Sequence, residues 1–226
     1  MGRSRIDLAA ESLRNGKMVV IYDGDEREGE ADLCIHARYA RPEMIGTLRK
    51  DAGGLICLAL DEGIATMLGL PFYTDLLASS NHPLARMECT KTAYGDKPAF
   101  SLQVNHKKVY TGITDNDRSL TITKMAELAE MMEPEKAETK GQDIRERFVA
   151  DFYSPGHVFL LIGRGIERRH GHTELTLELA KRARMSGAMV LCEMLGPGKA
   201  LTKEKAREYA EKNGYAFLEG KDIWSR

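Results

Sequence analysis

The stretch YDGDEREGEADL, residues 22–33, places six carboxylates around one arginine, Arg27. Charges of one sign at this density repel each other unless water, a cation or a charged ligand offsets them. An EF-hand does not fit, because position six counted from Asp23 is Glu28 rather than Gly and position twelve is Cys34 rather than Glu. The composition suits Mg²⁺ on carboxylates and an anionic substrate on the guanidinium, with a solvated loop as the alternative.

A second polar group is RRHGHTE, residues 168–174, which precedes a strongly amphipathic segment. Gly171, His172 and Thr173 fall at the expected helix start, where unpaired N–H groups face outward, and Arg169 lies beside them. This arrangement is typical of a phosphate site, and a neutral His172 can also bind a metal. The alternative is that these histidines are structural.

Three further residues could take part in chemistry. His157 in SPGH is expected at a turn entering a strand, where it is exposed. Glu193 in CEM ends an apolar strand, so it needs a partner, and its pKa could be raised enough for proton transfer. Cys57 follows the pair Gly53–Gly54, which lets backbone approach a ligand, although a small core residue explains this cysteine equally well.

The elements that must position these groups alternate along the chain. Apolar runs predict strands at 18–22, 31–37, 55–60, 99–106, 156–162, 188–195 and 215–220. Amphipathic or capped segments predict helices at 4–16, 42–52, 61–69, 120–132, 172–187 and 202–214, with Leu8 on the buried face of the first. Residues 72–98 are expected to be irregular, and the polar segment 133–146 is expected to be a surface loop. The order indicates an α/β protein (α+β in some schemes), a single domain over 1–226 with a mixed sheet flanked by helices.

Composition excludes several classes of protein. Lys and Arg number 33 against 34 Asp and Glu, so the net charge of −1 gives no reason to expect nucleic acid or an acidic membrane as partner. The four cysteines form no CxxC pair, which argues against a zinc ribbon and for a reducing compartment. No apolar run is long enough to cross a membrane, and we expect a cytoplasmic protein.

No single motif matches a P-loop, a dinucleotide fingerprint, a nucleophile elbow or a zinc-protease helix. Residue chemistry alone therefore indicates a metal-assisted enzyme with several acid–base groups, acting on a small phosphorylated substrate. As an ordered set, however, YDGDEREGEADL, RKDAGGLICLAL, TGITDNDRS, SPGHV, HGHTE and CEM resemble the 3,4-dihydroxy-2-butanone 4-phosphate synthase family of riboflavin biosynthesis, in its single-function archaeal form. The resemblance runs from about residue 6 to about residue 218.

This resemblance implies a lyase that converts D-ribulose 5-phosphate into 3,4-dihydroxy-2-butanone 4-phosphate and formate. The implied steps are metal-assisted enolisation, dehydration, skeletal rearrangement and elimination of C4. Mg²⁺ or Mn²⁺ is the implied cofactor, with two ions per site and no organic cofactor. The alternatives are another Mg²⁺-dependent enzyme acting on sugar phosphates, such as an aldolase-like lyase or a phosphatase, and a ligand-binding module without activity.

Roles carry over from the family by position. The resemblance implies that Glu28 and His172 are metal ligands and that His157, Glu193 and Asp32 are catalytic. It implies substrate contacts from Arg27, Glu28, Asp32, Cys57, Thr111, Ser154, Arg169, His170, Gly171, His172 and Thr173. One stretch departs from the family, because LLIGRG puts Ile162 where an arginine is usual, and Arg164 could replace it from a shifted register.

The resemblance also implies a homodimer with shared active sites. Glu28, His172 and Glu193 would come from one chain, and Thr111 and His157 from its partner. The 11 methionines and the apolar sheet suit a buried interface, but an ordinary core explains them equally well.

Overall fold

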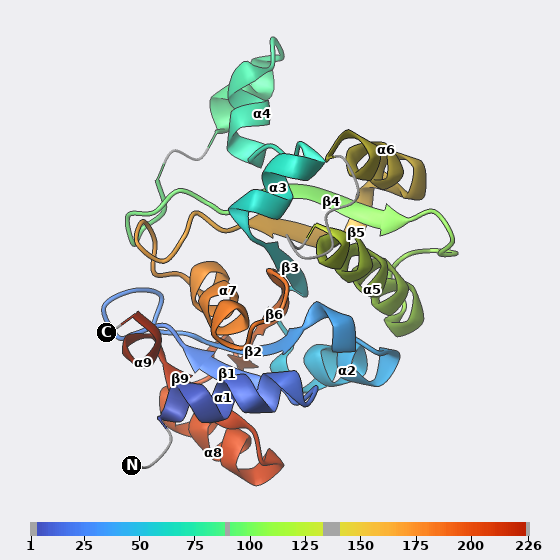
Figure 1. Cartoon of the computed structure of the whole chain (residues 1–226). Coiled ribbons are helices and arrows are strands. Elements are labelled where there is room, and N and C mark those ends of the chain that lie inside the picture. Colours follow the sequence, from blue (N-terminus) through green and yellow to red (C-terminus); the bar gives the residue numbers. More distant parts are fainter. Residues whose placement is uncertain (1–3, 89–90, 133–140, 225–226) are drawn as a thin grey trace.

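A computed structural model describes residues 4–88, 91–132 and 141–224. Its centre is a seven-stranded mixed sheet in the order β4-β5-β3-β6-β2-β1-β9 (Figure 1). Strands β3 and β5, and likewise β1 and β9, are parallel, whereas the other neighbours are antiparallel. The strands are β1 (Val19–Tyr22), β2 (Ala31–His36), β3 (Cys57–Leu60), β4 (Phe100–His106), β5 (Phe152–Ile162), β6 (Ala188–Glu193) and β9 (Ala216–Glu219), and the separate hairpin is β7 (Leu195–Gly196) with β8 (Lys199–Ala200).

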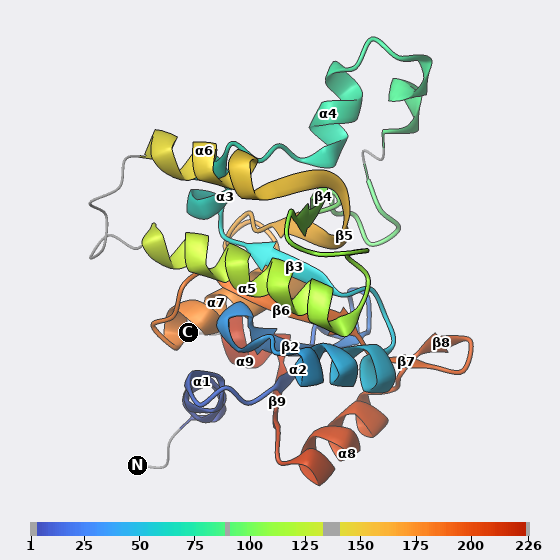
Figure 2. The same cartoon turned by 90° about the vertical axis from the view of Figure 1, so that its right-hand side faces the viewer.

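Helices cover both faces of the sheet (Figures 1 and 2). One face carries α1, α7 and α9, and the other carries α2, α3, α5, α6 and α8, while α4 projects away from the body. The α-helices are α1 (Arg5–Arg14), α2 (Pro42–Thr47), α3 (Glu62–Leu68), α4 (Tyr73–Ser79), α5 (Asp115–Met131), α6 (Gly141–Asp151), α7 (His172–Arg182), α8 (Lys203–Asn213) and α9 (Gly220–Trp224). The other helical turns are η1 (Ala37–Tyr39), η2 (Leu48–Ala52) and η3 (Pro83–Met87).

The predicted fold class is confirmed, and every predicted strand lies in the seven-stranded sheet. Alternation of the buried strand residues separates two cores. Val20, Leu58 and Val190 face α2 and α5, whereas Ile21, Ala59 and Leu191 face α1 and α7. Because both faces are covered, the central strands are apolar throughout, and this is why their sequences stand out.

Several local predictions were wrong. Residues 72–98 are not wholly irregular, because α4 and η3 lie within them. Of the segment 133–146, residues 133–140 lie outside the described residues, and 141–146 form the start of α6 rather than a loop. Here Ile144 and Phe148 supply the apolar face, and the second of these residues comes after the segment taken as loop. Strand β5 begins at Phe152 rather than at Gly156, and its pairing with β4 is interrupted between Tyr153 and Val158, where His157 lies.

Smaller corrections concern helix faces and ends. Leu8 is 48% exposed rather than buried, since Ile6, Ala9 and Leu13 fill the inner face of α1. Helix α5 starts at Asp115, five residues before the predicted start, because Thr114 caps it through the N–H of Asp117. Helix α7 ends at Arg182 rather than continuing to Gly187.

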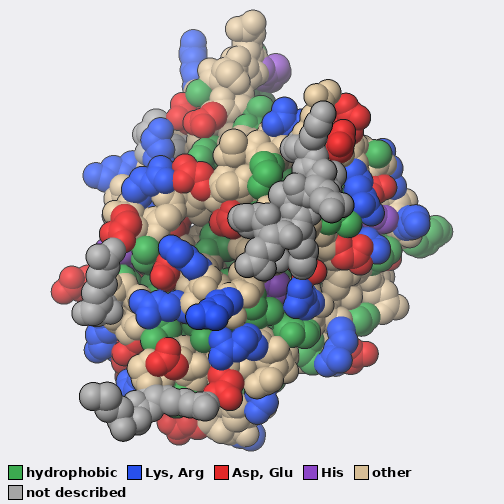
Figure 3. Space-filling view, viewed as in Figure 1, with side chains coloured by type: hydrophobic (Ala, Val, Ile, Leu, Met, Phe, Trp, Pro, Cys, Tyr) green, Lys and Arg blue, Asp and Glu red, His purple; other side chains and the backbone are tan. Residues whose placement is uncertain are grey.

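The surface carries both signs of charge. Acidic and basic side chains are intermixed over the face drawn in Figure 3, as the net charge of −1 leads one to expect. Among the described residues, no helix is both long enough and apolar enough to span a bilayer.

Candidate active site

The acidic loop between β1 and β2 is organised by its first carboxylate, Asp23, which is 1% exposed. Its Oδ1 accepts the backbone N–H groups of Gly24 and Glu30 at 2.8 and 3.1 Å. Its Oδ2 accepts the Glu28 N–H and the Arg27 guanidinium, both at 3.0 Å. With both oxygens occupied, Asp23 fixes the path of the loop. These bonds also hold Arg27 and Glu28, later in the same loop, in fixed positions.

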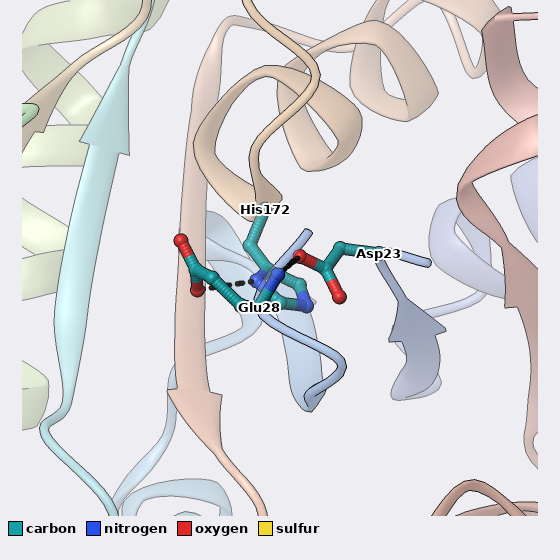
Figure 4. A group of neighbouring side chains, drawn as sticks. All are labelled: Asp23, Glu28 and His172. Carbon is teal, nitrogen blue, oxygen red and sulfur yellow. Dashed lines mark hydrogen bonds and ion pairs between the residues drawn. The ribbon is translucent and has the colours of Figure 1, made fainter. Parts of the chain in front are cut away.

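Glu28 and Asp32 both lie near His172, the first residue of α7. Figure 4 shows Glu28 beside the His172 ring, with Asp23 next to them. The imidazole Nδ1 lies 3.6 Å from Glu28 Oε2, and Nε2 lies 3.8 Å from Asp32 Oδ1. Nε2 also lies 3.1 Å from the carbonyl oxygen of Glu30. His172 and Asp32 are 5% and 1% exposed, so these charges interact at the edge of the protein interior, where screening by water is weak.

Burial and neighbouring charges shift the pKa values of all three groups. Burial is the main factor that raises the pKa of Asp32 to about 7, with Glu193 and Glu28 adding to the rise and His172 opposing it. Burial also disfavours the charged form of His172, but the charges of Asp32, Glu28 and Asp23 outweigh it and raise the pKa of this imidazole. For Glu28, burial is outweighed by His172 and Arg27, which lower its pKa to about 2.

These residues fit a divalent cation. Ligand atoms of Asp23, Glu28 and His172 lie within 4.8 Å of one another, and carboxylate oxygen with imidazole nitrogen suits Mg²⁺ or Mn²⁺. Asp23 already accepts four hydrogen bonds within the loop, which leaves Glu28 and His172 with more capacity to bind a cation. Asp32 Oδ1 is buried and has no hydrogen-bond partner among the described residues. A buried oxygen in this condition fits a site completed by a ligand.

Glu193 lies directly beside Asp32, because the two residues are paired across β2 and β6. Its Oε2 accepts the N–H of Leu55 at 2.7 Å, and its carbonyl oxygen accepts the N–H of Gly54 at 3.0 Å. A Cβ at position 54 would collide with the Glu193 side chain, so Gly54 makes room for this carboxylate. Cys57 is buried on the same sheet face, paired with Leu191 two residues before Glu193, and its side chain belongs to the core.

A candidate anion site adjoins these carboxylates at the start of α7. Gly171 is the N-cap and no side chain caps this end, which leaves backbone N–H groups for a ligand. Arg27 and Arg169 approach the same place, and Gly171 leaves them room, since a Cβ there would collide with the Arg169 guanidinium and lie 2.8 Å from Arg27 Nη2. The arginines also line a cavity of about 240 Å³, together with Tyr94, Asp96, Glu167, Arg168 and His170. This arrangement fits a phosphate.

His170 is oriented by the C-terminal helix. Its ring is stacked on the indole of Trp224 with 4.6 Å between centroids and 14° between planes. Thr173 is buried beside His172 in the first turn of α7. The predicted phosphate segment, residues 169–173, therefore contacts α9 through His170.

His157, Ser154 and Thr111 lie at the other end of the sheet, on β5 and on the turn after β4. Asn105 receives the His157 backbone N–H on its Oδ1 at 2.8 Å, which orients the amide so that its Nδ2 donates to His157 Nδ1 at 3.0 Å. A neutral His157 consequently carries its proton on Nε2. Thr111 bonds to Asp117 through both its N–H and its hydroxyl, and its neighbour Gly112 lies against Asn105.

The strand registers relate the two ends of the site. Cys57 pairs with Phe159 on β5 and with Leu191 on β6. Beyond Cys57 the register with β6 shifts by one residue, because Gly53 bridges Met194, and the pairing of β5 with β4 is irregular between Tyr153 and Val158. Asp32 and Glu193 are paired on β2 and β6, whereas His157 lies on β5, and β3 separates β5 from β6.

Sequence comparison relates this chain to one enzyme family. The sequence profile of the 3,4-dihydroxy-2-butanone 4-phosphate synthase family matches residues 7–226. The chain is 43% identical to the enzyme of that name from Methanosarcina mazei, over 96% of this chain and 89% of the relative. It is 41% identical to the one from Archaeoglobus fulgidus, over 94% and 89%. The chain belongs to the 3,4-dihydroxy-2-butanone 4-phosphate synthase family.

Solved structures of this family share the fold. A two-domain 3,4-dihydroxy-2-butanone 4-phosphate synthase from A. baumannii aligns with a TM-score of 0.76 and 28% identity, over 97% of this chain and 56% of that one. A second synthase, solved in complex with two magnesium ions, aligns with a TM-score of 0.74 and 24% identity, over 98% and 95%. The second comparison shows only that the fold is common to both.

The departure from the synthase pattern at LLIGRG has a structural account. Ile162 ends β5, pairs with Leu60 and is 4% exposed, so it belongs to the core. The Arg164 guanidinium lies 3.9 Å from the Phe72 ring and donates from Nη2 to the carbonyl oxygen of Pro98 at 3.2 Å. Its backbone N–H donates to Glu174, the carboxylate that also binds Arg169 at 2.6 Å. Arg164 thus shares an anchor with Arg169 and contacts the loop before β4.

Sequence reasoning missed four residues of this synthase site. Asp96 and Tyr94 contact Arg27 from a segment expected to be irregular, with Tyr94 lying 4.8 Å from the guanidinium. Asn105 orients His157, and Trp224 is stacked on His170. Each acts across a separation of about 50 residues or more in the chain, and no local pattern indicates such contacts.

Proposed function

We propose that this chain converts D-ribulose 5-phosphate into 3,4-dihydroxy-2-butanone 4-phosphate and formate, as a lyase of riboflavin biosynthesis. The observation that carries the proposal is the meeting of Glu28, Asp32 and His172 beside two arginines and an uncapped helix start. Metal ligands, a proton acceptor and a phosphate site are thereby combined within one small region. A sugar phosphate that must be deprotonated next to a carbonyl requires that combination.

Glu28 and His172 are the residues that would hold Mg²⁺ or Mn²⁺, and two ions per site are proposed from the family resemblance. A divalent ion here would stabilise negative charge on neighbouring substrate oxygens. His172 must be neutral to act as a ligand, and its pKa is raised in the metal-free protein. Metal binding is therefore expected to release a proton near neutral pH, which a weakly buffered titration would detect.

The phosphate is assigned to Arg27, Arg169 and the backbone of Gly171, His172 and Thr173, with His170 at the rim. The guanidinium groups supply charge and paired donors, and the helix start supplies unpaired N–H groups. Fixing the phosphate there places the sugar carbons toward Asp32 and Glu193. Binding at one end orients the reacting end, so the carboxylates meet a defined carbon rather than a mobile chain.

Three groups of the proposed site can move protons. Asp32 has a pKa of about 7 in the metal-free protein, which suits a base that must take a proton and return it. Glu193 is adjacent and is oriented by the Leu55 N–H. His157 presents Nε2, because its Nδ1 accepts from Asn105. The family resemblance also places Cys57 and Ser154 in the pocket. We assign no chemical role to their side chains.

We also propose a homodimer in which Thr111 and His157 reach the partner's site. Large apolar side chains are exposed around His157, and such a patch indicates a surface that another protein covers. Tyr110 is 96% exposed and Ile113 is 51% exposed on the turn with Thr111, and Tyr153 and Leu55 are also exposed. In the opposing arrangement, His157 serves the site of its own chain.

Mixed dimers distinguish the two arrangements. Each of the Glu28→Gln and His157→Ala homodimers is expected to be inactive. If sites are shared, a mixed dimer collects both defects in one site and leaves the other intact, so formate production returns on co-expression. Mixed dimers that form but remain inactive would place Glu28 and His157 of one chain in the same site.

The direct test of the reaction is formate release from D-ribulose 5-phosphate, assayed with and without EDTA. We expect formate that depends on protein and disappears when EDTA removes the divalent ion. Inorganic phosphate released without formate would instead identify a phosphatase, and neither product would identify a binding protein.

A further inference from the structure

Asp96, on the segment before β4, lies between the two arginines of the anion site. Its Oδ2 accepts a hydrogen bond from Arg27 Nη2 at 2.9 Å and lies 3.4 Å from Arg169 Nε. A single carboxylate oxygen thus faces both guanidinium groups. This is the geometry that an oxygen of a bound phosphate would adopt.

Neither arginine depends on Asp96 for its position. Arg27 is held by Asp23 and Glu28 at 3.0 and 2.8 Å, and Arg169 is held by Glu174 at 2.6 Å. The side chains of Asp23 and Glu174 are 0% exposed, whereas that of Asp96 is 31% exposed. The buried carboxylates are fixed parts of the site, and Asp96 is the partner that solvent can replace.

The contact with Asp96 does not satisfy every hydrogen-bond donor of the anion site. Arg169 is 8% exposed along its side chain, and its Nε makes no hydrogen bond within the described residues. A buried donor in that condition costs free energy until an acceptor reaches it. The 240 Å³ cavity lined by Arg27, Asp96 and Arg169 has room for such an acceptor.

We propose that Asp96 is a built-in competitor of the substrate's phosphate, occupying its place in the ligand-free protein and leaving when the phosphate binds. The assignment rests on the proposed function in so far as Arg27 and Arg169 bind that phosphate. Asp96 closes a turn in which its carbonyl oxygen accepts the Thr92 N–H at 2.8 Å. Tyr94 of the same turn covers the Arg27 guanidinium. Departure of the turn therefore uncovers Arg27 at the moment the anion arrives.

This competition makes the anion site selective. A ligand must bring enough negative charge to replace a carboxylate that is already in place. A phosphate monoester dianion meets this requirement better than a neutral sugar or a monocarboxylate. Asp96 thereby favours phosphorylated substrates over their dephosphorylated forms.

The test is the affinity for inorganic phosphate, measured by calorimetry with the whole protein at fixed ionic strength. Asp96→Asn keeps the shape of the side chain and removes its charge, so we expect the phosphate Kd to fall about three- to tenfold. The KM for D-ribulose 5-phosphate is expected to fall in parallel with little change in kcat. Phosphate binding is measurable without turnover, so a wrong assignment of the reaction and a wrong role for Asp96 give different results.

Asp115→Asn is the matched control. Asp115 also bridges two arginines, Arg49 at 2.9 Å and Arg118 at 3.3 Å, and its side chain is 28% exposed, but it lies outside the anion site. Its phosphate Kd is expected to stay at the wild-type value, and unfolding curves check that both variants fold. A Kd that is unchanged or higher in Asp96→Asn would show that Asp96 positions the arginines instead, and the proposal would be wrong. An equal fall of the phosphate Kd in both variants would mean that the loss of one negative charge explains the effect, and the proposal would also be wrong.

Discussion

Replacing Asp32 by Asn should stabilise the metal-free protein at alkaline pH, although it removes a proposed catalytic group. Asp32 is 1% exposed and its Oδ1 has no hydrogen-bond partner among the described residues. Burial first, and then the charges of Glu193, Glu28 and Glu30, raise its pKa to about 7 from a reference of 3.8, against the opposing charge of His172. Ionising this group in the folded protein is therefore unfavourable.

The direction of the pH dependence follows from proton counting. Because the folded pKa of Asp32 lies above the unfolded value, the folded state binds more protons between about pH 4 and pH 7. Wild-type stability is expected to fall as pH rises through that range and to stay lower above it. The difference between the folded pKa of about 7 and the reference of 3.8 corresponds to about 4 kcal/mol as an upper bound, at 1.36 kcal/mol for each pH unit. The Asp32→Asn variant also loses the attraction to His172 and buries an amide, which leaves a net gain of about 1–2 kcal/mol at pH 8.

The assay is urea unfolding with EDTA at pH 5 and pH 8. The gain of Asp32→Asn over wild type is expected at pH 8 and should nearly vanish at pH 5, where Asp32 is protonated in the folded protein. Asp75→Asn, at an exposed position on α4, is the control and should stay within about 0.5 kcal/mol at both values. A variant less stable than wild type at pH 8, or a gain that does not change with pH, would refute the reasoning.

Three other outcomes are expected. Glu28→Gln and His172→Ala should each weaken Mn²⁺ binding by about tenfold or more while the circular dichroism spectrum is kept, and unchanged Mn²⁺ affinity in both would mean that other residues are the ligands. Glu193→Gln can retain the bond from the Leu55 N–H, so kcat for formate should fall about 100-fold or more with KM within about threefold; an equal loss of substrate binding would make Glu193 a structural partner. Trp224 is the single tryptophan and is stacked on His170, so phosphate should change its fluorescence, whereas a flat signal during binding seen by calorimetry would contradict that placement.

Sequence patterns predicted the sheet well because its strands are buried on both faces. Runs such as VVIY and CLAL are apolar at nearly every position, and each ends directly before an aspartate, Asp23 or Asp61. The errors fall where local pattern and tertiary packing disagree. Helix α6 looked like a polar loop because its apolar face is completed by Phe148, after the segment that suggested a loop. The start of β5 was predicted four residues too late because SPGH is turn-like, and the pairing with β4 is irregular there, between Tyr153 and Val158.

Some residues of the candidate site could be predicted from local motifs, and others could not. Glu28 and His172 each stand out in a local motif, and the fold brings them within 3.6 Å. Asn105 and Trp224 are ordinary residues in sequence, and they matter only because β4 lies beside β5 and α9 lies beside α7. No periodicity or composition encodes such pairings, since each depends on long-range contacts that the whole sheet fixes.

The pairing of Asp32 with Glu193 is the strongest physical reason to regard this region as a site. Two carboxylates opposite each other on neighbouring antiparallel strands repel, and one of them is 1% exposed at the end of an apolar strand. An Asn–Gln or Val–Leu pair would serve the sheet better at the same positions. Within the described part of the chain, the cation that offsets the charge of Asp32 is His172, which Glu28 shares. This unfavourable ionisation of Asp32 suits a catalytic acid–base group. It raises the pKa of the carboxyl group, so that a proton can be taken up and released near pH 7.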